Sequence, residues 1–478
     1  MTLMQRNEFM TPWFTLQRSD DSCPVYISRP DNVEHMISIL PDALRAAAGG
    51  RNFTGESGEI IQLYSAEGAL IGVLAGVGEA GSDQTGPLAA GRIMRTLEPG
   101  IYMIAARPDG WDLKLTGIGW GLGAYKFDRY LPEKHVPAQL LLTDGYDSDE
   151  ITAIVRAINR GRDLINTPAG DMGPEELHAE AELVAAKYGA KITSVVGDAL
   201  LTENYPMIHA VGRAGPKPPR LVEMTWGDTH HPHLAIVGKG ITFDTGGLNI
   251  KSASGARIMK KDMGGAAHAI TLAEMIMANN LPVHLHVALA IAENSIASGS
   301  YHPGDVLSSR EGLTIEIDNT DAEGRLVLGD ALCKVAEAQP DHIIDFATLT
   351  GAARVALGPT LPPFFCNRDH LVPEIMASTL TAFDPLWPMP LWQPYRKLLS
   401  SPIADMKNAG GSFAGCITAA LFLERFVKES SWMHFDVYGW NPSRTDFGQG
   451  GGEIFATRAL YEWIKGGGVK SAPDPGNV

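Results

Sequence analysis

The sequence predicts an α/β protein with a smaller N-terminal α/β domain, a connecting helix and a larger C-terminal domain. The larger domain is expected to hold a central, mostly parallel β-sheet flanked by helices. Strand-like and helix-like segments alternate from residue 234 to residue 464, which is the pattern of strands joined by helices. The run 283–291 is apolar apart from two histidines, as in a strand buried on both faces. A chain of 478 residues is also long enough for two or three domains.

The first domain is predicted over residues 1–147. Two strands, 59–64 and 70–74, flank a short turn that is typical of a β-hairpin. Residues 101–105 form another predicted strand, and 112–125 has the spacing of a helix. Because this part contains no constellation of His, Cys or paired acids, we expect it to have a structural or oligomerisation role.

The helix predicted over 148–166 connects the two domains, and acidic residues in its first turn suit the helix dipole. The larger domain then covers 167–466. Residues 467–478 are rich in Gly, Pro and Ser and are predicted to be a disordered tail. The expected strands of the larger domain are 192–196, 220–225, 233–237, 283–291, 313–317, 341–346 and 434–437, and the expected helices are 174–188, 266–279, 327–338, 418–428 and 454–464.

Composition bounds the class of protein. The formal net charge is -16, and an acidic chain repels nucleic acid, so no nucleic-acid partner is expected. No apolar run approaches a membrane span, and the N-terminus lacks the apolar core of a signal peptide, so no membrane partner is expected either. The 4 cysteines are scattered without a C-x-x-C pair, which indicates reduced thiols and a cytoplasmic location.

Four carboxylates give the first indication of chemistry. Asp321 and Glu323 lie in the segment 319–326, between a predicted strand and a predicted helix, where scaffolds often present functional groups. Together with Asp244 and Asp262, they are expected at strand ends, each near a glycine. Four acids in one site cannot all ionise without a cation. A pair of divalent metals is therefore predicted, and an oxygen-rich ligand set leaves Zn2+, Mn2+, Co2+ and Mg2+ open.

Simpler interpretations of the same residues stay open at this point. The segment 319–326 alone also fits a solvated loop with an internal Asp–Arg pair, and Asp262 fits a partner of the helix dipole. Lys239 follows a glycine as in a phosphate-binding loop, but the other positions of that motif are not matched. The histidines between 230 and 233 are expected in a solvated loop.

Several spaced motifs occur in one order along the chain: 237–247, Lys251, 261–265, 319–326 and 347–352. Together they resemble the leucyl aminopeptidase family, the cytosol aminopeptidases, and the resemblance covers about 163–464. The motif Asn-Thr-Asp-Ala-Glu-Gly-Arg-Leu is highly specific. The resemblance implies a metal-dependent exo-aminopeptidase that releases N-terminal amino acids from short peptides by two-metal activation of a bridging water. It also implies a homohexamer.

The resemblance further implies a site for two divalent metal ions, Zn2+ or Mn2+. One ion would be held by Asp244, Asp321 and Glu323. The other would be held by Lys239, Asp244, Asp262 and Glu323. A lysine ligand must be a neutral amine, so Lys239 would need desolvation and the charge of the metal to lose its proton.

The resemblance assigns catalytic roles to two cations. Lys251 would stay charged and stabilise the oxyanion of the tetrahedral intermediate. Arg325 would hold a bicarbonate that shuttles the proton, since a guanidinium offers bidentate contact to an oxyanion. Two other classes are weighed against this one: a different dinuclear hydrolase such as a phosphoesterase, and a non-catalytic relative that binds or assembles.

The substrate pocket matches the family pattern only in part. Met259, Thr348 and Gly351 correspond to positions that line the pocket for the first substrate side chain. Tyr438 departs from the pattern, because the family usually has small residues after the strand 434–437. Tyr438 is expected to fill part of the pocket, so a preference for leucine does not follow from the resemblance.

Overall fold

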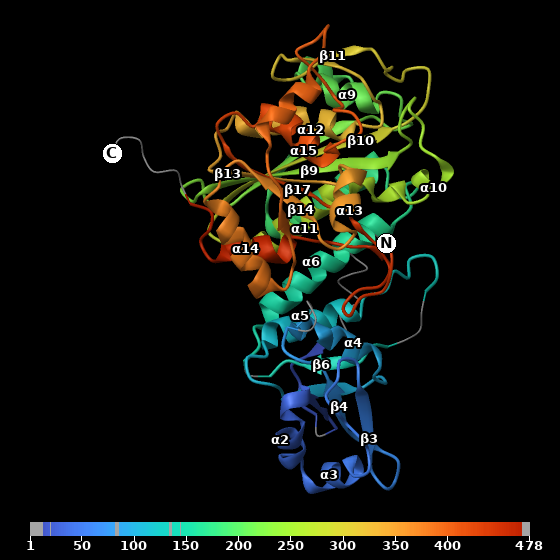
Figure 1. Ribbon diagram of the computed structural model, residues 1–478, viewed down its shortest axis with the longest axis vertical. Helices are drawn as coiled ribbons and strands as arrows, with labels where there is room; N and C mark the ends of the chain where they lie inside the picture. Colours follow the sequence, from blue (N-terminus) through green and yellow to red (C-terminus); the bar gives the residue numbers. More distant parts are fainter. Residues whose placement is uncertain (1–12, 20, 82–85, 133–135, 144, 471–478) are drawn as a thin grey trace, which may run out of the picture. The chain divides into compact units, whose positions relative to one another are not determined.

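The computed structural model describes residues 13–19, 21–81, 86–132, 136–143 and 145–470 (Figure 1). The chain forms two compact units, one of residues 1–159 with 443–450 and one of residues 160–442 with 451–478. The boundary falls within α6 (Ser148–Asn166), the helix predicted as the connection.

The first unit is built on a six-stranded sheet in the order β1-β6-β5-β2-β4-β3. Neighbouring strands run parallel except β3 and β4, which pair antiparallel and confirm the predicted hairpin. The strands are β1 (Phe14–Thr15), β2 (Cys23–Ser28), β3 (Ile60–Tyr64), β4 (Leu70–Gly76), β5 (Ile101–Ala106) and β6 (Gln139–Leu141), and the helices are α2 (Val33–Ser38), α3 (Asp42–Ala48), α4 (Ala90–Arg95) and α5 (Leu113–Gly123).

The second unit is built on an eight-stranded sheet in the order β15-β14-β17-β13-β9-β10-β8-β7. Its four central strands, β17, β13, β9 and β10, run parallel, while β14 and β8 pair antiparallel with their inner neighbours. The strands are β7 (Lys191–Val196), β8 (Arg220–Trp226), β9 (His233–Asp244), β10 (His284–Asn294), β13 (His342–Ala347), β14 (Pro363–Cys366), β15 (Trp387–Pro388) and β17 (Ser431–Asp436).

Helices cover both faces of this sheet. On one face α12 packs against β9 and β10 with α9 and α15 beside it, and on the other face α11 packs against β9 and β13 (Figure 1). The helices of the unit are α7 (Pro174–Tyr188), α8 (Ala199–Thr202), α9 (Pro206–Gly212), α10 (Ala253–Ala256), α11 (Gly264–Ala278), α12 (Gly324–Ala336), α13 (Gly351–Leu357), α14 (Leu371–Ala382), α15 (Gly415–Leu423) and α16 (Thr457–Lys465), and the short strands are β11 (Val306–Ser308), β12 (Thr314–Glu316), β16 (Met406–Lys407), β18 (Trp440–Asn441) and β19 (Gly451–Gly452).

One difference from the expected elements is the length of β9. The strand was predicted to end at residue 237 but continues to Asp244. The prediction ended the strand before Gly238 because glycine is unfavourable in a strand interior. Here the glycine serves close packing, since a Cβ at Gly238 would lie 2.6 Å from the Cα of Ala266 on α11.

The ends of two other predictions also differ from the structure. The last helix was expected from 454, but α16 begins at Thr457 because Ala456 has a left-handed φ of 65°. The predicted disordered tail is partly ordered: the amide of Gly468 donates to the carbonyl of Trp463 (2.9 Å), and Val469 is buried. The rest of the predicted tail, 471–478, lies outside the described residues.

The loop between β18 and β19 also departs from the expected organisation. Residues 443–450 were predicted within the larger domain, whereas the structure groups them with the first unit. There Asp446 pairs with Arg92 (Nη1 to Oδ1, 3.1 Å), and the carbonyl of Thr445 accepts a hydrogen bond from Arg95. None of the helices in the described part of the chain has the length and apolarity that crossing a membrane requires.

Candidate active site

The predicted site residues meet beyond the carboxyl ends of the four central strands of the second unit. A pocket of about 560 Å³ opens there, at the edge where parallel sheets with helical connections bind ligands. The residues predicted to bind metal, substrate or the oxyanion all line it: Lys239, Asp244, Lys251, Met259, Asp262, Asp321, Glu323, Arg325, Thr348, Gly351 and Tyr438.

The carboxylates reach this pocket from three different segments. Asp244 is the last residue of β9, and Asp262 lies in the 3-10 helix Met259–Met263. Glu323 stands at the N-cap position of α12, two residues after Asp321 in the preceding loop. The expectation that all four carboxylates stand at strand ends is therefore right only for Asp244. Asp321 and Glu323 lie at the start of α12, and Asp262 lies just before α11. Its place on a helical turn directly before α11 still brings it to the same pocket.

Lys239 lies inside β9, and its side chain runs against the start of α12. A Cβ at Gly324 would lie 2.7 Å from the Nζ atom of Lys239, so only glycine leaves room for the lysine there. The amine of Lys239 pairs with Asp262 Oδ2 (2.6 Å) and Glu323 Oε1 (2.9 Å), and it donates to the carbonyl of Thr348 (3.2 Å). The glycine of the motif therefore makes space for a buried ionic contact.

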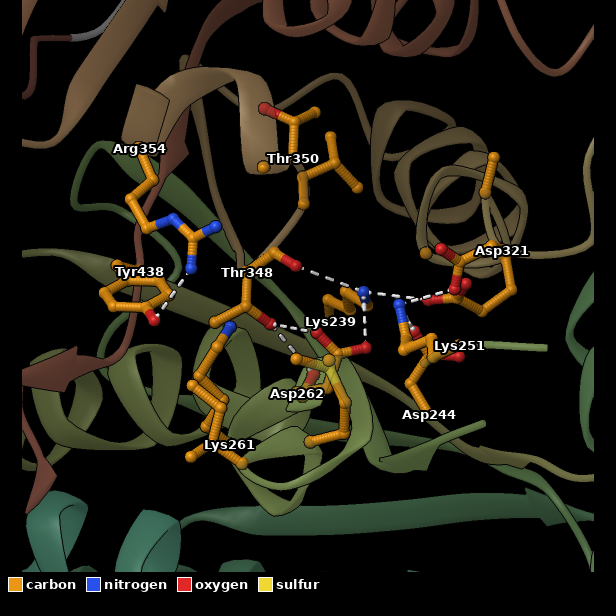
Figure 2. Close-up of a pocket in the computed structure, with 18 of the residues that line it drawn as sticks. Lys239, Asp244, Lys251, Lys261, Asp262, Asp321, Thr348, Thr350, Arg354 and Tyr438 are labelled. Carbon is orange, nitrogen blue, oxygen red and sulfur yellow. Dashed lines mark hydrogen bonds and ion pairs between the residues drawn. The ribbon is translucent and has the colours of Figure 1, made fainter. Parts of the chain in front are cut away.

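Lys251 likewise pairs with two carboxylates of the site. Its amine pairs with Asp244 Oδ2 (2.7 Å) and Asp321 Oδ1 (2.5 Å) (Figure 2). Asp244, Asp262 and Glu323 are all buried, and each offers a ligand atom within 4.8 Å of the others. Asp321 stands nearer to solvent, with its side chain 32% exposed. The structure thus places two ammonium groups among four carboxylates.

The charges in this group are not balanced. Burial and the neighbouring Asp244 raise the pKa of Glu323 to about 8 and the pKa of Asp321 to about 6. Although burial alone favours the neutral amine, Asp262 and Glu323 raise the pKa of Lys239 above its usual value. Surplus negative charge on oxygen ligands is what divalent cations require. The residues present therefore fit the predicted pair of metal ions.

Asn294 is a member of this group that the sequence motifs did not indicate. It ends β10, and its pairing with Asp244 across the two parallel strands is fixed by the register of β9 and β10. Its fully buried side chain donates from Nδ2 to Asp244 Oδ1 (2.8 Å) and to the carbonyl of Thr320 (3.1 Å). The available signal was a polar residue at the end of an otherwise apolar strand.

Arg325 lies in the first turn of α12 and lines the pocket. The residue is 8% exposed, and its Nε and Nη1 atoms are buried with no hydrogen-bond acceptor among the described residues. Burial lowers the pKa of this guanidinium to about 10. A buried guanidinium with unused donors suits an oxyanion, so this position fits the predicted bicarbonate.

The opposite side of the pocket carries Tyr438 and two cations that the sequence analysis did not single out. The Oη atom of Tyr438 accepts a hydrogen bond from Arg354 Nη1 (3.0 Å). The amine of Lys261 lies 4.8 Å from the centre of the Tyr438 ring. Burial lowers the pKa of Lys261 to about 8. In the sequence, both cations look like ordinary charged residues of helical segments.

Comparisons with known proteins find two family models that match the chain. Residues 159–461 match the "Cytosol aminopeptidase family, catalytic domain", and residues 23–143 match the "M17 aminopeptidase, N-terminal domain". The second match extends the family likeness into the first domain, beyond the range of the resemblance described above. A probable cytosol aminopeptidase of Syntrophotalea carbinolica is 33% identical, over 95% of this chain and 98% of the relative.

Two solved structures share the fold. The cytosol aminopeptidase from Coxiella burnetii superimposes with a TM-score of 0.89 at 41% identity, covering 95% of this chain and 99% of that one. The bottromycin maturation enzyme BotP in complex with Mn gives a TM-score of 0.84 at 30% identity, covering 94% and 99%. The chain belongs to the cytosol aminopeptidase family and is a peptidase.

Proposed function

We propose that the protein is an exo-aminopeptidase that uses two divalent metal ions, Zn2+ or Mn2+, to release the first residue of short peptides. The ligands are Lys239, Asp244, Asp262, Asp321 and Glu323. The observation that carries this proposal is the convergence of four carboxylates and two lysines on one pocket. A relative solved in complex with Mn supports a divalent ion. Peptidase membership disfavours the phosphoesterase and the binding-protein alternatives.

When bound, the two cations supply Lewis acidity that polarises the peptide carbonyl and lowers the pKa of a water between them. The chain's own residues hold and orient the substrate. Asp262 is a buried anion in the pocket wall. It would therefore attract the free amino group at the start of a peptide. Because an internal peptide bond has no free amino group nearby, this contact restricts cleavage to the first residue.

Lys239 and Lys251 are proposed to act differently although both contact carboxylates. Lys239 is 2% exposed, and a cation that competes for Asp262 and Glu323 would remove the attraction that keeps its amine protonated. It can then serve as a neutral ligand. The Lys251 side chain is 17% exposed, so its amine keeps its charge more easily and can stabilise the oxyanion that forms on the carbonyl.

Arg325 is proposed to hold a bicarbonate that carries the proton from the attacking water to the leaving amine. Its Nε and Nη1 atoms, for which the described part of the chain offers no acceptor, support this role. An anion bound there would also balance the positive charge of the guanidinium in a buried setting.

Hydrolysis by the metal-stripped protein tests the proposed function. We expect no cleavage of dipeptides or amino-acid anilides without metal, and restored cleavage after addition of Mn2+ or Zn2+. Co2+ and Mg2+ are included to rank the working metals. An N-acetylated peptide is the control, because it lacks the amino group that Asp262 and the metals are proposed to hold. Equal cleavage of the blocked peptide, or no cleavage with any metal, would contradict the proposal.

The pocket for the first side chain is proposed to be lined by Met259, Thr348, Gly351 and Tyr438. Replacing Tyr438 by alanine should raise kcat/KM for peptides that begin with phenylalanine or tryptophan by about 10-fold, because the ring occupies space in the pocket. Tyr438→Phe keeps the ring and should leave the acceptance of these apolar residues unchanged. Steady-state kinetics on one panel of dipeptides measures both variants, and an unchanged profile for Tyr438→Ala would show that the ring does not limit the pocket.

Assembly and location are proposed on the family alone. Membership of the cytosol aminopeptidase family supports a homohexamer in the cytoplasm. Reduced thiols fit that location, since Cys23, Cys333, Cys366 and Cys416 are all free. Light scattering of the purified full chain checks the assembly, and a molar mass below six copies would contradict it.

A further inference from the structure

Lys261 is a buried lysine in the wall of the pocket. The residue is 5% exposed, lies in the 3-10 helix Met259–Met263 and lines the cavity. Within the described part of the chain, no carboxylate lies within ion-pair distance of its amine and no atom accepts a hydrogen bond from it. A buried ammonium of this kind is costly unless an anion or another acceptor reaches it. The pocket is the direction from which such a group can come.

The carboxylates of this wall are already engaged with other groups. Asp262 pairs with Lys239 (2.6 Å) and accepts a hydrogen bond from Thr348 Oγ1 (2.8 Å). Asp436 accepts hydrogen bonds from the hydroxyl (2.6 Å) and the amide (3.1 Å) of Thr350. Neither carboxylate forms an ion pair with Lys261, so neither of them neutralises its charge by direct contact.

Two more donors lie beside Lys261. Arg354 on α13 is exposed at the rim of the pocket, and its guanidinium lies 5.1 Å from the centre of the Tyr438 ring. Because the Tyr438 oxygen accepts a hydrogen bond from Arg354, its own O–H proton stays available to a ligand. We call Lys261, Arg354 and Tyr438 the basic wall. Figure 2 shows them together on one side of Thr348, with Lys251 and Asp321 on the other side.

We propose that the basic wall binds the side-chain carboxylate of the first substrate residue, so that the enzyme favours peptides beginning with glutamate or aspartate. This inference rests on the proposed function, because the amino terminus of the substrate must be held by the metal-binding carboxylates on the other side of Thr348. An acidic side chain would give Lys261 a direct ion-pair partner, which none of the described residues provides. A lysine or arginine side chain in the same place would meet two cations and be rejected.

A purely structural role for Lys261 is the competing explanation. In that case its charge would only moderate the negative potential of the metal-binding carboxylates. Its loss would then change the turnover of every substrate by the same factor. A role in specificity instead predicts opposite changes for acidic and apolar first residues. The two explanations therefore differ in the ratio of kcat/KM values.

The test uses the full metal-loaded protein and four dipeptides that begin with glutamate, glutamine, methionine or lysine and share the same second residue. Glutamate and glutamine differ in charge at equal size, and methionine is an apolar match in length. We expect kcat/KM for the glutamate peptide to exceed that for the glutamine peptide by about 10-fold or more, since hydrogen bonds to charged groups discriminate at this level. The lysine peptide should be the poorest substrate. An aspartate peptide tests the shorter acid.

Lys261→Met removes the charge and keeps an unbranched side chain of similar length. It should lower kcat/KM for the glutamate peptide by about 10-fold or more, mainly through KM, and raise that for the methionine peptide. Lys260→Met is the matched control, because Lys260 donates to the carbonyl of Asn166 and does not line the pocket. It should leave the ratio between the two peptides unchanged. Arg354→Gln, at the exposed rim, should lower the preference for glutamate by a smaller factor.

The outcomes separate this inference from the proposed function. Cleavage of all peptides with an apolar preference, or an equal loss for all peptides in Lys261→Met, overturns the inference and leaves the aminopeptidase proposal intact. Absence of cleavage for every peptide overturns the aminopeptidase proposal. Calorimetric binding of free L-glutamate and L-norleucine to the metal-loaded protein then still tests the basic wall. Tighter binding of norleucine, or equal binding by Lys261→Met and the unchanged protein, counts against it.

Discussion

Replacing Asp321 by asparagine is expected to lower kcat/KM for a free-amine peptide by about 1,000-fold, because activation by two metals contributes several kcal/mol to transition-state stabilisation. The change removes one of the four converging carboxylates and leaves its shape. Since the Asp321 side chain is 32% exposed, the fold should tolerate the substitution. Metal analysis of the purified variant should show the loss of one of the two ions together with the loss of turnover.

Asp318→Asn is the matched control for this prediction. Asp318 lies in the same loop region and is exposed, and its backbone amide donates to Asn408 Oδ1 (2.9 Å). No described residue makes a hydrogen bond or ion pair with its carboxylate. The Asp318→Asn variant should keep both metals and its full activity. If Asp321→Asn also keeps both ions and its turnover, Asp321 is not a ligand. If both variants lose activity equally, the loop rather than the carboxylate is responsible.

The fold could be predicted where the sequence pattern records burial. The run 283–291 became β10, one of the central strands, because a strand covered on both faces must be apolar throughout. The sequence pattern gave a wrong prediction where close packing depends on glycine, which has no side chain. Gly238 and Gly240 lower strand propensity within β9, yet a Cβ at Gly238 would meet the Cα of Ala266 at 2.6 Å. Only the neighbouring helix explains why glycine is found there.

The site could be predicted to the extent that its residues lie in compact motifs. Asp321, Glu323 and Arg325 stand within one segment, so their joint role is readable from the chain. Asn294 is 50 residues from its partner Asp244 and reaches it through the register of two parallel strands. The lack of a direct ion-pair partner for Lys261 among the described residues was equally hidden, because it is a property of the folded pocket. A linear motif contains no information on which residues pair across strands or which side chains are buried.

Replacing Arg325 by methionine should make the protein more stable and less active. Nε and Nη1 of Arg325 are buried with no acceptor among the described residues, and removing an unpartnered buried charge should raise the free energy of unfolding by about 1–3 kcal/mol. Loss of the proposed bicarbonate site should lower kcat by about 100-fold, the usual scale of assisted proton transfer. Urea denaturation and steady-state kinetics measure the two effects.

Arg325→Lys separates the effect of charge from the effect of geometry. It keeps a buried cation, so the gain in stability should be absent, but an ammonium cannot make the bidentate contact that a guanidinium makes to an oxyanion. Added bicarbonate should raise the unfolding midpoint of the unchanged protein, because a ligand that binds only the folded state stabilises it, and it should have little effect on Arg325→Met. A lower stability of Arg325→Met would mean that the guanidinium is held by the protein itself. Such a group would be structural, and no bound anion would then be needed to explain why Arg325 is buried.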